Sequence, residues 1–135
     1  MNDDTRTAKM QFLLASTGSV FTEADYQALS NQIEVHKYLI NQHISWTISW
    51  DDAAFSWCEN VFSPIMQVVD HWEVRAAFPD MTRAQLFFAI SDHWYYLMEK
   101  DPSVYANYAA IDYAANYGKG LGKFMSRLQL PKRVA

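Results

Sequence analysis

Cysteine, glycine and proline are all scarce in this sequence, which has one cysteine, four glycines and four prolines in 135 residues. A single cysteine, Cys58, excludes an internal disulfide framework and is typical of a reducing compartment. The few glycines and prolines favour long regular elements over a loop-rich all-β fold. No apolar run reaches the length of a membrane-spanning helix, and the first nine residues are polar. We therefore expect a folded cytoplasmic protein.

Motifs of common enzyme classes are also missing. The sequence has no nucleophile elbow, no phosphate-binding loop, no dinucleotide fingerprint and no Ser-His-Asp order. Cys58 lies between Trp57 and Glu59 with no basic neighbour that would lower its pKa, so we expect a structural thiol. The acidic pair Asp51-Asp52 is interpreted as part of a helix start. We assign no catalytic residue and predict a protein that is not an enzyme.

Charge is distributed unevenly along the chain. The net charge is −4, yet every charged residue after Gly118 is basic. These residues are Lys119, Lys123, Arg127, Lys132 and Arg133. The preceding 117 residues therefore carry a net charge of −9. We predict an acidic helical bundle domain over residues 1–118 and a basic amphipathic tail over residues 119–135.

Helical periodicity is the dominant pattern in the sequence. Caps and apolar stripes predict an all-α bundle of four main helices over residues 22–42, 50–75, 82–100 and 102–117. Three starts carry a capping pattern, namely Thr22 with Asp25, Ser49 with Asp52, and Thr82 with Gln85. Asp101-Pro102 is interpreted as the fourth start and Gly118 as its end. A further helix is expected over residues 5–16.

Proline interrupts the second of these helices. Pro64 removes a backbone donor and forces a kink, so residues 50–75 form either two helices or one bent helix.

Two segments of the chain resemble each other. Residues 21–38 align with residues 78–95 at an offset of 57, and after the loss of one residue the alignment continues from 53–60 onto 109–116. The matched pairs are Phe21 and Phe78, Leu29 and Leu86, Ile33 and Ile90, His36 and His93, Tyr38 and Tyr95, Ala53-Ala54 and Ala109-Ala110, Trp57 and Tyr113, and Asn60 and Asn116. Either a helix-loop-helix unit is duplicated, or two amphipathic helices share a pattern by chance. A duplication predicts a pseudo-twofold bundle with its two histidines near the axis.

The matched histidines, His36 and His93, lie in the middle of apolar helical stripes and are expected to point inward. Histidines facing each other in a bundle can bind a transition metal or haem. A di-iron site, however, needs a glutamate three residues before each histidine, and these positions hold Ile33 and Ile90. We favour buried structural histidines without a cofactor, and keep a metal or haem site at His36 and His93 as the alternative.

Aromatic residues make up 16% of the sequence. Trp94 and Tyr95 lie on a different helical face from His93, so this cluster meets either another helix or a partner. Exposed tryptophan and tyrosine are favoured interface anchors, and we expect a partner to contact Trp94 and Tyr95.

The tail combines cations with an apolar stripe of Leu121, Phe124 and Leu128. It either folds back on the acidic body or docks into a partner, for which Lys123, Phe124 and Arg127 are the expected contacts. Nucleic acid or a membrane surface is a candidate partner for this tail alone. Its five charges can contact only a few phosphates, and the acidic body opposes the approach of DNA.

One group of residues follows the pattern of a known family, namely Trp57, Val61-Phe62-Ser63-Pro64, Phe78-Pro79, Thr82 and His93 to Glu99. In these residues the chain resembles a bacterial all-helical domain of unknown function. It implies an all-helical fold in a bacterial cytoplasm and transfers no active-site residue. We expect a helical module that binds another protein or assembles as a homodimer.

Overall fold

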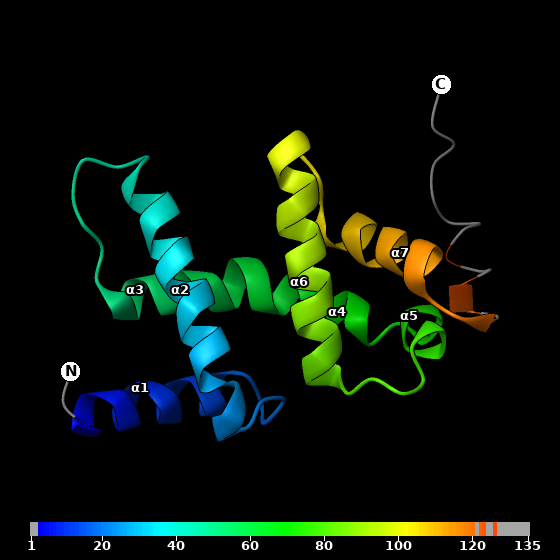
Figure 1. The fold of residues 1–135 in the computed structure, drawn as a ribbon. Coiled ribbons are helices and arrows are strands. Elements are labelled where there is room, and N and C mark those ends of the chain that lie inside the picture. Colours follow the sequence, from blue (N-terminus) through cyan, green and yellow to red (C-terminus); the bar gives the residue numbers. More distant parts are fainter. Residues whose placement is uncertain (1–2, 121, 124–125, 127–135) are drawn as a thin grey trace. The chain divides into compact units, whose positions relative to one another are not determined.

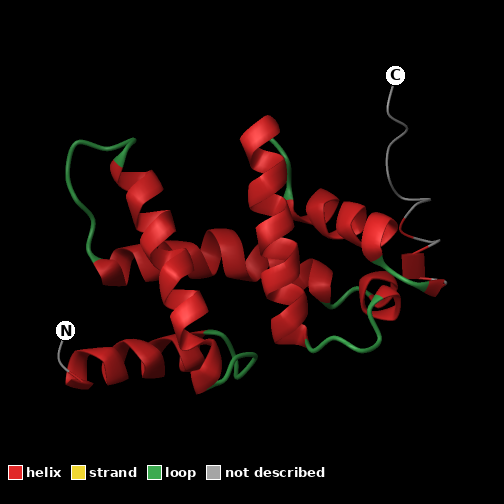
Figure 2. Cartoon of the chain, viewed as in Figure 1, coloured by secondary structure: helices red, strands yellow, loops and turns green. Residues whose placement is uncertain are grey.

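The computed structural model describes residues 3–120, 122–123 and 126, and these residues form two compact units. Unit 1 is Met1–Phe62 and unit 2 is Ser63–Ala135. The described residues form helices joined by loops and contain no strand (Figures 1 and 2). The prediction of an all-α fold is confirmed.

Within the described part of the chain, no helix combines the length and apolar character needed to cross a membrane.

Unit 1 contains three α-helices and two short helical segments. They are α1 (Asp3–Ser16), η1 (Glu23–Asp25), α2 (Tyr26–Asn41), α3 (Trp50–Trp57) and the π-helical η2 (Cys58–Phe62). Helix α2 packs against α3, and the core between them is fully buried at Leu29, Ile33, Ala53, Ala54 and Trp57. The side chains of α2 that reach this core are spaced by about one helical turn, as the sequence predicts.

The predicted starts of the unit 1 helices are present. The Thr22 backbone N–H donates to Asp25 Oδ2 at 2.9 Å at the start of η1, and Ser49 Oγ accepts from the Asp52 N–H at 3.1 Å at the start of α3. Each contact satisfies a backbone donor that the first helical turn leaves free.

The predicted helix over residues 50–75 is divided. It consists of α3, η2, α4 (Ser63–Val69) and α5 (Trp72–Ala77). The π turn ends at Phe62, and Pro64 is the second residue of α4, two residues later. Proline has no N–H to donate and its ring collides with the carbonyl four residues earlier, and the wider π turn relieves this collision.

Unit 2 contains α4, α5, α6 (Arg83–Lys100) and α7 (Ala106–Tyr117). Helix α7 packs against α4, α5 and α6, so it forms the centre of the unit. It is well suited to this position because Ala109, Ala110 and Ala114 are completely buried and allow close approach of its neighbours. The predicted capping box of α6 is present, since Thr82 and Gln85 exchange hydrogen bonds of 2.9 and 3.1 Å.

The predicted helix start at Asp101-Pro102 is wrong. Asp101 is the C-terminal cap of α6, and α7 begins only at Ala106. Asp101 Oδ1 accepts hydrogen bonds from the Ser103 N–H and hydroxyl, at 3.0 and 2.6 Å. This local turn satisfies the carboxylate, which is therefore not used to cap the next helix.

The two aligned segments form the same helix pair. Helices α2 and α6 begin 57 residues apart, and α3 and α7 begin 56 residues apart. Helix α6 has 18 residues against 16 in α2, and its following loop is shorter by three, which explains the single lost residue. We call α2–α3 repeat 1 and α6–α7 repeat 2. These matching boundaries support the duplication, whereas the pseudo-twofold axis stays a prediction.

The start of the basic tail lies against α5. The Lys119 N–H donates to the Ala77 carbonyl at 2.9 Å. A Cβ on Gly118 would collide with the Ala114 carbonyl, and one on Gly122 would collide with the Ala77 amide. Gly118 ends α7 as predicted, but its φ of −79° is not left-handed, so close packing is the reason for glycine here. These contacts favour a tail that folds back on the body, up to Lys123.

We predict that Gly122→Ala lowers the free energy of unfolding by about 2–3 kcal/mol, because its Cβ meets backbone atoms that cannot move independently. Gly120→Ala is the matched control, because a Cβ there meets nothing within 4 Å and costs only the left-handed φ of +59°, about 1 kcal/mol. Urea denaturation followed by circular dichroism measures both. Equal losses in the two variants would contradict the close packing.

Candidate functional site

His36 is half-buried and bonded within unit 1. Its Nε2 lies 2.9 Å from Ser56 Oγ, which joins α2 to α3. Burial lowers the pKa of His36 below the ordinary value of 6.5, because a charged imidazole loses hydration there. The neutral ring is therefore favoured at neutral pH.

His93 makes the corresponding contact in unit 2 with a different partner. Its Nε2 lies 2.7 Å from Asp112 Oδ2, and the two side chains are only 12% and 6% exposed. Three tyrosine rings, Tyr96, Tyr113 and Tyr117, lie around the imidazole with centroids 5.5 to 6.2 Å away. Tyr113 and Tyr117 also pack on each other, with ring centroids 5.1 Å apart.

An asparagine completes the arrangement in each repeat. Asn60 Nδ2 donates to the Ser56 carbonyl at 2.9 Å and to Ser56 Oγ at 3.1 Å. Asn116 Nδ2 donates to the Asp112 carbonyl at 2.8 Å and to Asp112 Oδ1 at 3.2 Å. Ser56 and Asp112 occupy equivalent positions, since each lies four residues before its asparagine. Sequence reasoning found the histidine and asparagine matches but missed this third one, because serine and aspartate differ in chemistry.

These contacts give both histidines a hydrogen-bonded structural role within their own units. Among the residues that the structure describes, no group of three or more His, Cys, Asp or Glu side chains is arranged to hold a metal ion. The transition metal or haem at His36 and His93 stays a prediction.

Cys58 is half-buried, and its pKa is raised by burial and by the nearby charge of Glu59. A raised pKa keeps the thiol protonated, which supports a structural thiol.

Trp94 and Tyr95, the predicted partner contacts on α6, are partly buried within unit 2. The Trp94 indole N–H donates to the Val104 carbonyl at 2.9 Å and so fixes the loop before α7. Burial and the charge of Asp92 raise the pKa of Tyr95 to about 12, and its buried hydroxyl has no hydrogen-bond partner among the described residues.

Of the predicted tail contacts, Lys123 is half-buried, whereas Phe124 and Arg127 lie outside the described residues. Their roles in binding stay predictions.

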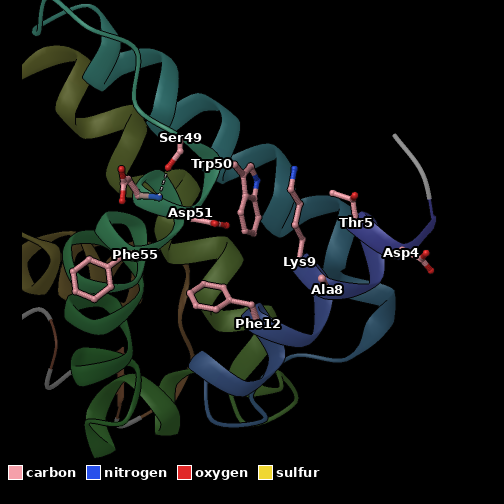
Figure 3. A pocket seen from close by; sticks show the side chains of 10 residues that line it. Asp4, Thr5, Ala8, Lys9, Phe12, Ser49, Trp50, Asp51 and Phe55 are labelled. Atoms are coloured by element: carbon pink, nitrogen blue, oxygen red, sulfur yellow. Dashed lines mark hydrogen bonds between the residues drawn. The ribbon is translucent and has the colours of Figure 1, made fainter.

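A groove lies between α1 and the start of α3 in unit 1. It has a volume of about 870 Å³, and Figure 3 shows the residues that line it. The lining residues are Asp4, Thr5, Ala8, Lys9 and Phe12 from α1, with Ser49, Trp50, Asp51, Asp52 and Phe55 at α3. Sequence reasoning did not find this site, because it depends on where α1 packs.

Aromatic rings form the apolar part of the groove. Phe12 packs edge-on against Trp50 with centroids 6.3 Å apart, and Lys9 Nζ lies 4.8 Å from the Trp50 ring centroid. Trp50 is only 8% exposed, whereas Phe12 is 42% and Phe55 is 59% exposed. Two of the three rings are therefore available to a ligand.

Carboxylates outnumber cations along the same groove. Asp4, Asp51 and Asp52 are exposed lining residues, and Lys9 is the cation among them. Since Lys9 already lies over Trp50, the groove presents excess negative charge beside exposed rings.

Comparison with protein-family models, with curated proteins and with solved structures finds no match in any of the three. The resemblance to a bacterial helical domain therefore stays a prediction.

We predict that His93→Ala lowers the free energy of unfolding by about 1 kcal/mol more than His36→Ala. Both variants lose an imidazole, but only His93→Ala removes a hydrogen-bond partner of a buried carboxylate, and hydrogen bonds to charged groups contribute more than neutral ones. Urea denaturation of the two variants measures the difference. Equal losses would mean that Ser56 and Asp112 hold their histidines equally well.

The lowered pKa of His36 predicts a pH dependence. The unfolded chain takes up a proton at higher pH than the folded one, so stability is complete above pH 6.5 and falls as the pH drops below it. We expect His36→Gln to reduce this fall between about pH 8 and pH 5.5, a range above the titration of most carboxyl groups. Unfolding curves of the variant and the parent across this range measure the effect. Parallel pH profiles would contradict it.

Proposed function

We propose that this protein is a non-enzymatic binding module whose unit 1 groove takes up a protein segment with basic and apolar side chains. The observation that carries the proposal is the combination of exposed aromatic rings and exposed carboxylates among the residues that line one groove, which Figure 3 draws. Aromatic side chains, phenylalanine included, are enriched at protein interfaces, and a few residues there carry most of the binding energy.

The exposure of the rings favours a protein segment over a small molecule. Small-molecule sites usually enclose most of the ligand surface. Here Phe12 and Phe55 line the groove while keeping about half of their surface open. An extended or helical segment that lies along α1 and α3 covers both rings without entering a closed cavity.

The charge of the groove favours basic side chains in the ligand. Asp51 and Asp52 are in the first turn of α3, where the helix dipole favours their negative charge. Both remain exposed, so a lysine or arginine of the ligand reaches them at little cost in desolvation. Opposite charges of this kind increase the rate and selectivity of association more than the affinity.

The alternative of a metal or haem site at His36 and His93 has less support. In each histidine the Nε2 atom is already hydrogen-bonded inside its own repeat, to Ser56 in one and to Asp112 in the other.

We predict that a labelled peptide of alternating lysine and leucine binds the full chain, and that Phe55→Ala weakens this binding about tenfold. Phe55 is 59% exposed, so its loss should leave the fold intact. Tyr38→Ala is the matched control, because Tyr38 is an exposed ring on α2 outside the groove. Fluorescence anisotropy measures both affinities, with a glutamate–leucine peptide as the control for charge.

Two results would overturn the proposed site. One is equal weakening by Phe55→Ala and Tyr38→Ala, and the other is equal binding of the glutamate–leucine peptide.

A further inference from the structure

The groove of unit 1 and the end of the chain have complementary chemistry. The groove offers three carboxylates and exposed rings, and residues 127–135 contain three cations and no acidic residue. These cations are Arg127, Lys132 and Arg133, interleaved with Leu128, Leu130 and Val134. This is the class of segment that the proposed function requires.

Earlier parts of the tail are already used in the fold. Lys119 bonds to Ala77, Gly122 lies against the backbone of α5, and Ser126 is completely buried. Residues 127–135 follow this anchored stretch and contain most of the tail's charge. Nine residues reach at most about 30 Å when extended, enough to cover several helical turns of a neighbouring molecule.

We propose that residues 127–135 of one copy occupy the unit 1 groove of a second copy, so that two chains exchange tails in a closed dimer. The inference rests on the proposed function and names the partner of the same groove. Reciprocal exchange fills both grooves and leaves no free tail, which gives a finite twofold assembly and not an open chain. The second tail then binds at the high effective concentration set by the first.

The test is an exchange of charge between groove and tail, measured as molecular mass by light scattering over a wide range of concentration. The groove variant is Asp4→Lys with Asp51→Lys, and the tail variant is Arg127→Glu, Lys132→Glu and Arg133→Glu. The expected result is that the parent forms a dimer and that each variant alone raises the dimer dissociation constant at least about tenfold. An equimolar mixture of the two should recover the dimer, because each reversed groove then meets a reversed tail.

The matched control is Glu34→Lys with Glu59→Lys. These exposed residues of unit 1 lie outside the groove lining, so the pair changes the net charge as much as the groove variant does. It should dimerise like the parent. Circular dichroism verifies folding, and Asp4→Asn with Asp51→Asn replaces the groove variant if lysine there prevents folding.

The remaining outcomes separate this inference from the proposed function. A parent that stays monomeric but binds the lysine–leucine peptide through Phe55 overturns the tail exchange and leaves the binding module standing. A dimer that ignores the groove and tail variants also overturns the exchange. Failure of both dimerisation and peptide binding overturns both proposals.

Discussion

Close contact between small side chains is the constraint on which both repeats depend. Ala53 and Ala54 on α3, and Ala109 and Ala110 on α7, are completely buried. Alanine has almost no side chain to interpose, so each helix can lie close to its partner, α2 or α6. A larger residue at these positions would push the helices apart, since a close-packed core has no spare volume.

The histidine contacts follow from this close approach. Ser56 and Asp112 lie within one turn of the alanine pairs, and each is within hydrogen-bond distance of a histidine on the other helix. A buried polar group needs a hydrogen-bond partner. The hydrogen bond and the packing of the alanines therefore both fix how α3 is aligned along α2 and how α7 is aligned along α6. The contacts of the two aligned histidines are two copies of one helix–helix contact, His36 with Ser56 and His93 with Asp112.

The histidine contacts of the two repeats differ in chemistry but have the same geometry. Repeat 1 has Ser56 beside Trp57, and the Trp57 indole N–H is bonded to Gln32 at 3.0 Å. Repeat 2 has Asp112 beside Tyr113. A serine contributes a neutral hydrogen bond, whereas the buried Asp112 carboxylate is stabilised by contacts that include His93 Nε2 and Asn116 Nδ2. We therefore expect repeat 2 to depend more strongly on its histidine.

Features encoded within a few residues could be predicted from the sequence. The caps at Ser49 and Thr82 and the helix end at Gly118 depend on local hydrogen bonds and spacing, so their residues appear together in the chain. The turn at Asp101 was mistaken for a helix start, because aspartate before proline satisfies either interpretation until Ser103 is seen to donate to it. The groove could not be predicted, because Phe12 and Trp50 are far apart in sequence and meet only when α1 packs on its unit.

Under the proposed function, one set of residues in the acidic groove would serve both stability and recognition. Carboxylates in the first turn of a helix are favourable there, so Asp51 and Asp52 support α3 whether or not a ligand is bound. Their stabilising effect is local, but their repulsion acts across a body whose charge before Gly118 is −9. A basic segment in the groove offsets that repulsion and leaves the helix start intact. Because the charges are exposed, this gain must shrink as salt screens them, whereas the contacts with Phe12 and Phe55 persist.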